Sequence, residues 1–375
     1  MTSIANSTIG IELINDKNWM GGTLYLKNLV MILSQLPPSE RPKIKLFGSL
    51  AMINELEKEM ERRRDTNLRF WADKLFKFFK KNKLCYKDYD IDVIYPGFGS
   101  VKGTHKLLRW IPDFQHKHYP DLFTDEELQR REFAIKEIVE SGESVVLSSK
   151  TAAHDLKIFF PNSLAKVNVW RFCSFIDWPE WQSQIIQKYQ IPDKFLYLPN
   201  QFWAHKNHLT VLKALSFLKK KGVVIPLVCT GAQSDRRNKM YFSKILDFIE
   251  KEQLTGQVYL LGLIPRNDQI GIFRKAAAVI QPSCFEGWST VVEDTRAIGR
   301  PIFISDIPVH KEQAPPKAIY FSPLSDSILA DLLYDHWPSL CPGPDFLSEQ
   351  SARNEMNQRI RSTALEFCRI IENTI

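Results

Sequence analysis

Short apolar segments separated by amphipathic stretches recur along all 375 residues, and this alternation restricts the fold more than any other feature. In the first half these segments are IGIELI, KIKLFG, IDVIYPG, LLRWIPD, SVVLSS and VNVWRF. In the second half they are KFLYLP, IPLVCTG, VYLLG, AAVIQPS, PIFIS and AIYFS. Apolar segments of this length are typical of strands buried in a parallel sheet. Strand, crossover and strand repeated this often predict an α/β protein with two Rossmann-like, doubly wound sheets.

The stretches between the strands predict helices at residues 23–36, 208–220 and 237–252, and a last helix at 351–375. The segment QKYQIPDK, residues 187–194, interrupts the pattern with a proline and predicts a domain boundary. We therefore expect an N-terminal domain at 1–190, a C-terminal domain at 191–350, and a final helix that packs back on the N-terminal domain. A hinge at the boundary would leave the two domains facing each other across a cleft.

The composition is that of an ordinary folded protein, with 44% hydrophobic and 25% charged residues. No apolar run approaches the roughly 18 to 20 residues that a membrane span needs. The first residues lack a basic segment followed by an apolar one, so no secretory signal is indicated and a cytoplasmic location is expected. The six cysteines show no CxxC or Cys/His spacing, which argues against a zinc site or a disulfide framework.

The net charge of +7 is concentrated in one region, because residues 62–87 contain ten basic and two acidic residues. Within it, residues 68–84 place apolar side chains at helical spacing beside lysines. Such a helix could dock on an anionic membrane surface, which would make the protein peripheral on the inner face of the membrane. A core-facing helix with a solvated basic face explains the pattern equally well. Nucleic acid is not expected as a partner, since no recognition motif accompanies the charges.

The most informative stretch is PSCFEGWSTVVEDTRAIGRPIFISDIPVH, residues 282–310. The strand segment AVIQPS ends in a turn that carries Glu286, and Ser289 and Thr290 then open a helix. Free backbone N–H groups at the start of a helix bind anions, so this turn predicts a site for a diphosphate. The alternative is a capped surface helix with solvated acidic residues.

This stretch resembles the family 4 retaining glycosyltransferases of the GT-B fold, also described as glycosyltransferase group 1. Their motif places a second Glu after a first Glu and seven further residues, in a context similar to EGFGxPxxEAxAxGxP. The present sequence reads EGWSTVVEDTRAIGRP and matches at Glu286, Gly287, Ala297, Gly299 and Pro301. Asp294 stands where the second Glu belongs, with Glu293 one position earlier. The resemblance implies that Glu286 contacts the donor sugar and that Asp294 or Glu293 contacts the ribose.

A second family element is an Arg followed five residues later by a Lys, and both bind the donor diphosphate. The sequence PNQFWAHKNH matches at Lys206 and has Gln201 in place of the Arg. The resemblance therefore implies a diphosphate contact by Lys206. Loss of the other cation should weaken diphosphate binding unless Asn207 or a helix terminus takes part. The alternative is a solvated lysine at the start of a helix.

Gly21 and Gly22, in NWMGGTLYLKNL, are expected after a strand and before a helix. In the resembling family a similar glycine loop lies against the donor phosphates and the acceptor. A simple tight turn would explain the two glycines equally well.

The segment WIPDFQHKHYPDLF, residues 110–123, places several polar side chains after a strand, which is typical of a site wall. The resemblance implies a histidine near the donor sugar, for which His116 is the better candidate. Asp113, Gln115 and His118 are candidates for the acceptor side. A zinc site is disfavoured, because the H-x-H spacing lacks a third ligand.

The segment GLIPRNDQIGIF, residues 262–273, resembles the family loop that frames the nucleotide base, with Leu263 and Ile264 nearest to it. It also fits an ordinary loop before a helix capped by Asn267 or Asp268. With these residues, the expected donor contacts are Gly21, Gly22, Gln201, Lys206, Leu263, Ile264, Glu286, Gly287, Trp288, Ser289, Thr290, Glu293 and Asp294.

No cofactor or metal is expected, because Lys206 and the helix start at Ser289 can supply the positive potential that a leaving diphosphate needs. The acidic string from Asp88 to Asp92 leads into a strand rather than following one, which is the wrong end for a ligand site in a parallel sheet.

The resemblance implies transfer of a hexosyl group from a UDP- or GDP-sugar to a glycan or lipid-linked acceptor, with retention of configuration. Glu286, His116 and Lys206 are then the expected catalytic residues. Two alternatives remain open, since fold alone does not decide chemistry. One is another GT-B enzyme, such as a sugar-nucleotide epimerase or a phosphorylase. The other is a non-catalytic nucleotide-sugar-binding or scaffold protein, which Gln201 and Asp294 favour.

Overall fold

The structure is a computed structural model that describes residues 4–14, 16, 19–61, 90–97, 105–178, 184–235 and 237–375. The chain divides into two compact units. Unit 1 comprises residues 1–113, 132–175 and 358–375, and unit 2 comprises residues 114–131 and 176–357. The division lies earlier than the boundary expected at 187–194, because helix α6 (Ile185–Tyr189) already packs on helix α9 (Arg266–Lys275) of unit 2. Among the described residues, no helix is long and apolar enough to cross a bilayer.

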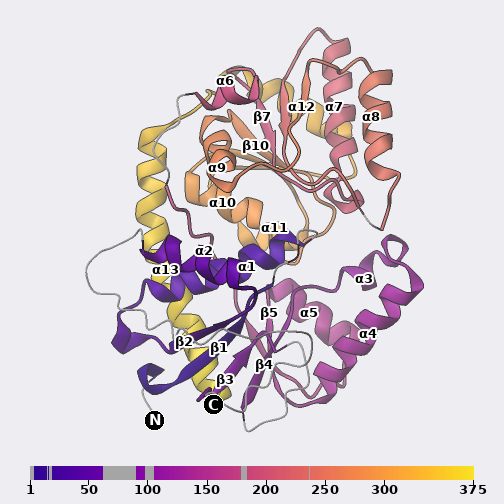
Figure 1. Cartoon of the computed structure of the whole chain (residues 1–375). Coiled ribbons are helices and arrows are strands. Elements are labelled where there is room, and N and C mark those ends of the chain that lie inside the picture. The colour runs from indigo at the N-terminus through magenta and orange to yellow at the C-terminus, as the bar shows by residue number, and fades with distance from the viewer. Residues whose placement is uncertain are drawn as a thin grey trace. The chain divides into compact units, whose positions relative to one another are not determined.

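Unit 1 is built on a six-stranded parallel sheet with the order β2-β1-β3-β4-β5-β6 (Figure 1). Its strands are β1 (Thr8–Glu12), β2 (Lys43–Phe47), β3 (Val93–Tyr95), β4 (Lys106–Ile111), β5 (Ser144–Leu147) and β6 (Lys166–Val169). Its helices are α1 (Met20–Ser34), α2 (Leu50–Glu61), the second part of α4 (Asp125–Glu140), α5 (Lys150–Phe159) and the end of α13 (Phe346–Thr374). The strand order reverses between β1 and β3.

An aromatic cluster joins the sheet of unit 1 to α1 and to the end of α13. Tyr25 of α1 stacks on Trp110 of β4 with ring centroids 4.1 Å apart. Trp170 donates a hydrogen bond to the carbonyl of Thr363 at 3.0 Å, and its ring lies 4.8 Å from that of Phe367. These contacts hold the last turns of α13 in unit 1.

Helix α13 begins at Phe346, before the predicted start at residue 351. The reason is local, because Asp345 Oδ1 accepts a hydrogen bond from the N–H of Ser348 at 3.0 Å, as an N-terminal capping carboxylate does.

Unit 2 is built on a second six-stranded parallel sheet with the order β12-β11-β10-β7-β8-β9. Its strands are β7 (Leu196–Leu198), β8 (Leu227–Cys229), β9 (Val258–Leu260), β10 (Ala278–Gln281), β11 (Ile302–Ser305) and β12 (Ala318–Phe321). Its further helices are α3 (Gln115–His118), α7 (His208–Lys220), α8 (Tyr241–Lys251), α10 (Thr290–Ile298), α11 (Pro308–Gln313) and α12 (Asp326–His336). The strand order reverses between β7 and β10.

The core of unit 2 follows from the alternation of side chains along β7. Leu196 and Leu198 belong to the cluster that α7, α8 and α12 bury, whereas the ring of Tyr197 lies edge-on against Phe273 of α9. Helix α7 contacts both α8 and α12, as Figure 1 shows. Both faces of the strand are thus covered, which explains its continuous apolar sequence.

Within the described residues, the twelve strands coincide with the twelve apolar segments of the sequence. The predicted α/β fold of two Rossmann-like, doubly wound parallel sheets is therefore confirmed.

Candidate functional site

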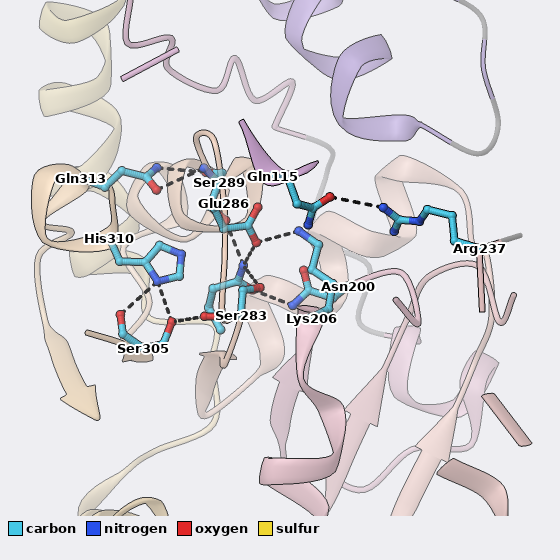
Figure 2. A network of polar contacts seen from close by, with 11 residues as sticks. Gln115, Asn200, Lys206, Arg237, Ser283, Glu286, Ser289, Ser305, His310 and Gln313 are labelled. Carbon is cyan, nitrogen blue, oxygen red and sulfur yellow. Dashed lines mark hydrogen bonds and ion pairs between the residues drawn. The ribbon is translucent and has the colours of Figure 1, made fainter. Parts of the chain in front are cut away.

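The reversal of strand order between β7 and β10 defines where a ligand of unit 2 is expected. The two strands are hydrogen-bonded neighbours, and open parallel sheets bind ligands outside the carboxyl ends of the strands at such a point. Lys206 follows β7 on a short 3-10 helix (Ala204–Lys206), and Glu286 follows β10. Lys206 Nζ lies 2.6 Å from Glu286 Oε1 (Figure 2). The structure thus brings together two of the expected site residues.

Hydrogen bonds between the loops after β7 and β10 fix this pair. Asn207, which has left-handed backbone angles, donates from Nδ2 to the carbonyls of Pro282 at 3.1 Å and Pro323 at 2.8 Å. Asparagine tolerates this conformation better than most residues. The N–H of Cys284 donates to the carbonyl of His205 at 2.8 Å. Lys206 and Glu286 are therefore held on loops that are bonded to each other.

Gln281, the last residue of β10, also binds Glu286. Its Nε2 donates to Glu286 Oε1 at 2.8 Å and its Oε1 accepts from Asn200 Nδ2 at 2.6 Å. Gln281 is fully buried, whereas the Glu286 and Lys206 side chains keep 9% and 15% of their surface exposed. Sequence analysis missed Gln281, although a polar residue that ends the buried strand AVIQ was a usable signal.

Gln313 occupies the start of helix α10, where a diphosphate was expected. Its Oε1 accepts from the N–H of Ser289 and its Nε2 donates to the Ser289 carbonyl, each at 3.1 Å (Figure 2). Its Nε2 also donates to Glu293 Oε1 at 3.1 Å. One backbone donor at this helix start is therefore already bonded within the protein. Thr290 is the first residue of the helix, and Gly287 and Trp288 lie half-buried in the preceding loop.

The two residues expected at the ribose are both buried. Glu293 is fully buried and bonded to Gln313, as described above. Asp294 is 5% exposed, and its oxygens accept from Arg266 Nη1 at 2.8 Å and Nη2 at 2.6 Å. In this structure both carboxylates are thus engaged within unit 2, and their ribose contact stays a prediction. The sequence did not indicate Arg266, which is the first residue of α9.

His310 is a buried, neutral imidazole in the same network. Its Nδ1 lies 2.9 Å from Ser305 Oγ and 3.0 Å from the Ser305 carbonyl oxygen. Because Ser305 Oγ donates its proton to the Ser283 carbonyl at 2.6 Å, Nδ1 must be the protonated nitrogen. Burial lowers the pKa of His310 to about 4, although the charge of Glu286 acts in the opposite direction.

The loops after β7, β8 and β9 pack closely at the same edge of the sheet. The N–H of Gly231 donates to the Gly262 carbonyl at 2.8 Å, and a Cβ at Gly231 would lie 2.2 Å from the Asn200 carbonyl oxygen. Beside this contact Gln201 is half-buried, and its Nε2 has no hydrogen-bond partner among the described residues. Its role at the diphosphate stays a prediction.

The loop between β9 and α9 carries Leu263, which is 61% exposed, and Ile264, which is half-buried. Their place at the nucleotide base stays a prediction. The expected cap of α9 by Asn267 or Asp268 is wrong, because the helix already begins at Arg266, after Pro265. Asp268 instead accepts from Lys188 Nζ and the Tyr189 hydroxyl, each at 2.6 Å.

Gly21 and Gly22 lie within the first turn of α1 rather than in a loop before it. A Cβ at Gly22 would lie 2.8 Å from the indole of Trp19, whereas a Cβ at Gly21 would lie 3.9 Å from Trp19 Nε1. The glycine at position 22 is therefore explained by packing against Trp19. A contact of either glycine with a ligand stays a prediction.

The polar segment after β4 is divided between the units, because Asp113 ends the first stretch of unit 1 and α3 belongs to unit 2. Gln115 Oε1 accepts from Arg237 Nη1 at 3.2 Å (Figure 2), and the ring of His118 lies 5.3 Å from Phe285. His116 is buried. The helix thus brings Gln115 and His118 to the loops after β8 and β10.

No group of three or more His, Cys, Asp or Glu side chains in the described ranges is arranged to hold a metal ion. Asp92 precedes β3, and its Oδ2 accepts from the N–H of Thr8 at 2.7 Å. Asp88 and the basic segment 68–84 lie outside the described residues.

Residues 182–323, which contain the Lys206–Glu286 pair, match the family described as glycosyl transferases group 1. The O-antigen chain mannosyltransferase RfbU of Salmonella typhimurium is 25% identical over 252 residues, which cover 66% of this chain and 63% of that protein. The chain thus matches less than two thirds of that relative's length.

Three solved structures share the fold. Sucrose-phosphate synthase from Thermosynechococcus elongatus is 12% identical over 98% of this chain and 99% of that chain, with a TM-score of 0.65. A glycosyltransferase from Rickettsia africae is 16% identical over 98% of both chains, with a TM-score of 0.64. Anabaena HepE in complex with UDP-glucose is 13% identical over 98% of both chains, with a TM-score of 0.65. Residues 182–323 therefore match the glycosyl transferases group 1 family, in a chain with the GT-B fold.

Proposed function

We propose that the protein is a glycosyltransferase that moves a hexosyl group from a UDP- or GDP-sugar to a glycan or lipid-linked acceptor. The observation that carries this proposal is the Lys206–Glu286 pair at the strand-order reversal of the group 1 domain. A cation suits a donor diphosphate, and a carboxylate beside it suits the hydroxyls of the attached sugar.

In the proposed reaction the bond between the anomeric carbon and the diphosphate breaks, and a bond to an acceptor oxygen forms. Negative charge develops on the leaving diphosphate, so Lys206 and the positive end of the α10 dipole, which Gln313 does not remove, stabilise the transition state without a metal ion. The acceptor proton passes to the leaving phosphate oxygen on the same face of the sugar, which retains the configuration. We propose that the protein carries out this reaction in the cytoplasm, on the inner face of the membrane.

The relatives suggest which donors to test first. The Salmonella relative is named a mannosyltransferase, and the Anabaena structure was solved with UDP-glucose. GDP-mannose and UDP-glucose therefore head the panel of candidate donors for this chain.

A second candidate function is nucleotide-sugar binding without catalysis. The observation that favours it is the Arg266–Asp294 pair, which occupies both oxygens of a carboxylate expected at the ribose. Tight binding of a nucleotide without any turnover of its sugar derivative would support this reading.

The test is to mix the full chain with UDP-, GDP- and dTDP-sugars in the presence of EDTA, and to record thermal shifts and donor hydrolysis. We expect a shift of several degrees with one nucleotide, a smaller shift in Lys206→Ala, and loss of hydrolysis in Glu286→Ala. If none of the nucleotides shifts the melting temperature, the proposed donor site is contradicted.

A further inference from the structure

The two oxygens of the Glu286 carboxylate have different surroundings. Oε1 accepts from Lys206 Nζ at 2.6 Å and from Gln281 Nε2 at 2.8 Å. Within the described part of the chain no hydrogen bond reaches Oε2. The carboxylate is therefore fixed through one oxygen, and the other is available to a ligand hydroxyl.

Lys206 has two competing partners in the proposed function. Its ammonium group is paired with Glu286 here, and the same group is proposed to bind the donor diphosphate. A diphosphate carries more negative charge than one carboxylate, so donor binding draws Lys206 toward the phosphates. Glu286 then loses its cation at the moment when it must hold the sugar.

Gln281 is held in place by contacts that do not involve Lys206. It is fully buried at the end of a central strand, and its Oε1 is fixed by Asn200 Nδ2 at 2.6 Å. The Gln281 amide can therefore turn away from Glu286 only by breaking the bond to Asn200. A neutral amide has no affinity for a distant phosphate charge comparable to that of an ammonium group, so it remains with the carboxylate.

We propose that Gln281 is a positioning residue, which holds Glu286 through Oε1 while Lys206 exchanges this carboxylate for the donor diphosphate. This inference rests on the proposed function. Before the donor binds, Glu286 competes with the diphosphate for Lys206. After the donor has bound, Glu286 contacts the sugar.

The first test measures the affinity of the full chain for UDP and GDP, which lack the sugar to be transferred. Glu286→Gln removes the competing charge, so we expect the preferred nucleotide to bind about five- to tenfold more tightly while donor turnover is lost. Equal or weaker nucleotide binding in Glu286→Gln would overturn the exchange. If neither nucleotide binds the wild-type protein, the proposed function itself fails.

The second test separates positioning from structural support. Gln281→Met keeps the length of the side chain and removes its amide, so we expect kcat for donor turnover to fall about 10- to 100-fold while the Kd for the nucleotide stays within about twofold. A purely structural role would change both quantities together. That outcome would overturn the assignment of Gln281.

The matched control is Gln257→Met. Gln257 is another buried glutamine of unit 2, and its Nε2 donates to the Ile225 carbonyl at 2.9 Å, at the amino ends of β8 and β9. We expect this variant to lose thermal stability and to keep the wild-type kcat. If Gln281→Met does not fold, the nucleotide affinity of Glu286→Gln still decides whether the exchange occurs.

Discussion

Asp294 and Arg266 form a two-bond ion pair that is mostly shielded from water, with 5% and 29% of the side chains exposed. Replacing the carboxylate by an amide removes a negative charge beside a partly buried guanidinium. We therefore expect Asp294→Asn to lower the free energy of unfolding by about 2 kcal/mol. Urea unfolding of both proteins measures this difference.

The control for Asp294→Asn is Asp306→Asn, which breaks an exposed ion pair of the same unit. Lys311 and Asp306 are 3.6 Å apart, and their side chains are 60% and 44% exposed. Exposed pairs contribute little, so we expect a loss below about 0.5 kcal/mol. Equal losses in the two variants would contradict the structural role of the Arg266–Asp294 pair.

Two buried histidines predict how stability depends on pH. Burial lowers the pKa of His208 to about 3 and that of His310 to about 4, from an ordinary value near 6.5. Between about pH 4 and 6.5 the unfolded chain binds protons that the folded chain does not, so the free energy of unfolding rises with pH in this range. Each histidine contributes up to about 1.4 kcal/mol per pH unit.

His208→Phe removes one of these two proton-binding groups. Phenylalanine can replace the imidazole because this ring stacks on Phe202, with centroids 4.2 Å apart. We expect a shallower rise of stability with pH in this variant, measured by urea unfolding at several pH values from 4.5 to 7. An unchanged slope would show that His208 is protonated alike in both states.

At the scale of the element, two neighbouring glycines at the start of α1 should respond differently to replacement by alanine. We expect Gly22→Ala to lower Tm, because its Cβ would lie 2.8 Å from the Trp19 indole. Gly21→Ala meets no such atom, and alanine favours a helix over glycine by roughly 1 kcal/mol, so Tm should stay or rise. Thermal melts that follow tryptophan fluorescence distinguish the two. The packing explanation of Gly22 fails if both variants melt alike.

Strands and several helices were predictable from the sequence because their signal is local. The helix expected at 208–220 is α7 as observed, since its apolar spacing and its N-terminal polar segment lie within one stretch. The helix expected at 237–252 begins only at Tyr241, because Arg237 instead bonds Asp235 and stacks over Trp203 at 4.8 Å. Element ends thus depend on partners that the local pattern does not contain.

The candidate site was predictable only in part for the same reason. Lys206 and Glu286 stand in recognisable motifs, and their meeting follows from strands that are neighbours at the reversal. Gln281, Arg266 and Gln313 act through partners between 5 and 81 positions away in the sequence. Their bonds depend on how side chains meet in the folded unit.

At the scale of the whole molecule, α13 starts in unit 2 and ends in unit 1. Phe367 is fully buried there against Tyr95 and Trp170. We expect Phe367→Ala to lower the free energy of unfolding of unit 1 by roughly 3 kcal/mol. In calorimetry, the loss of stability should appear in the unfolding transition of unit 1, which added nucleotide should not shift.

The control for Phe367→Ala lies at the other end of the same helix. Phe346 is 61% exposed, so Phe346→Ala should change the free energy of unfolding by less than about 0.5 kcal/mol. Comparable losses at the two ends would contradict the assignment of the last turns to the core of unit 1.

The proposed function requires unit 2 to bind a donor diphosphate at the reversal between β7 and β10, with Lys206 as its cation. The most direct measurement is a crystal structure of the full chain with the nucleoside diphosphate that gives the largest thermal shift. We expect a phosphate oxygen within hydrogen-bond distance of Lys206 Nζ, with Glu286 still bonded to Gln281. Nucleotide bound away from Lys206, with the Lys206–Glu286 pair intact, would contradict the account.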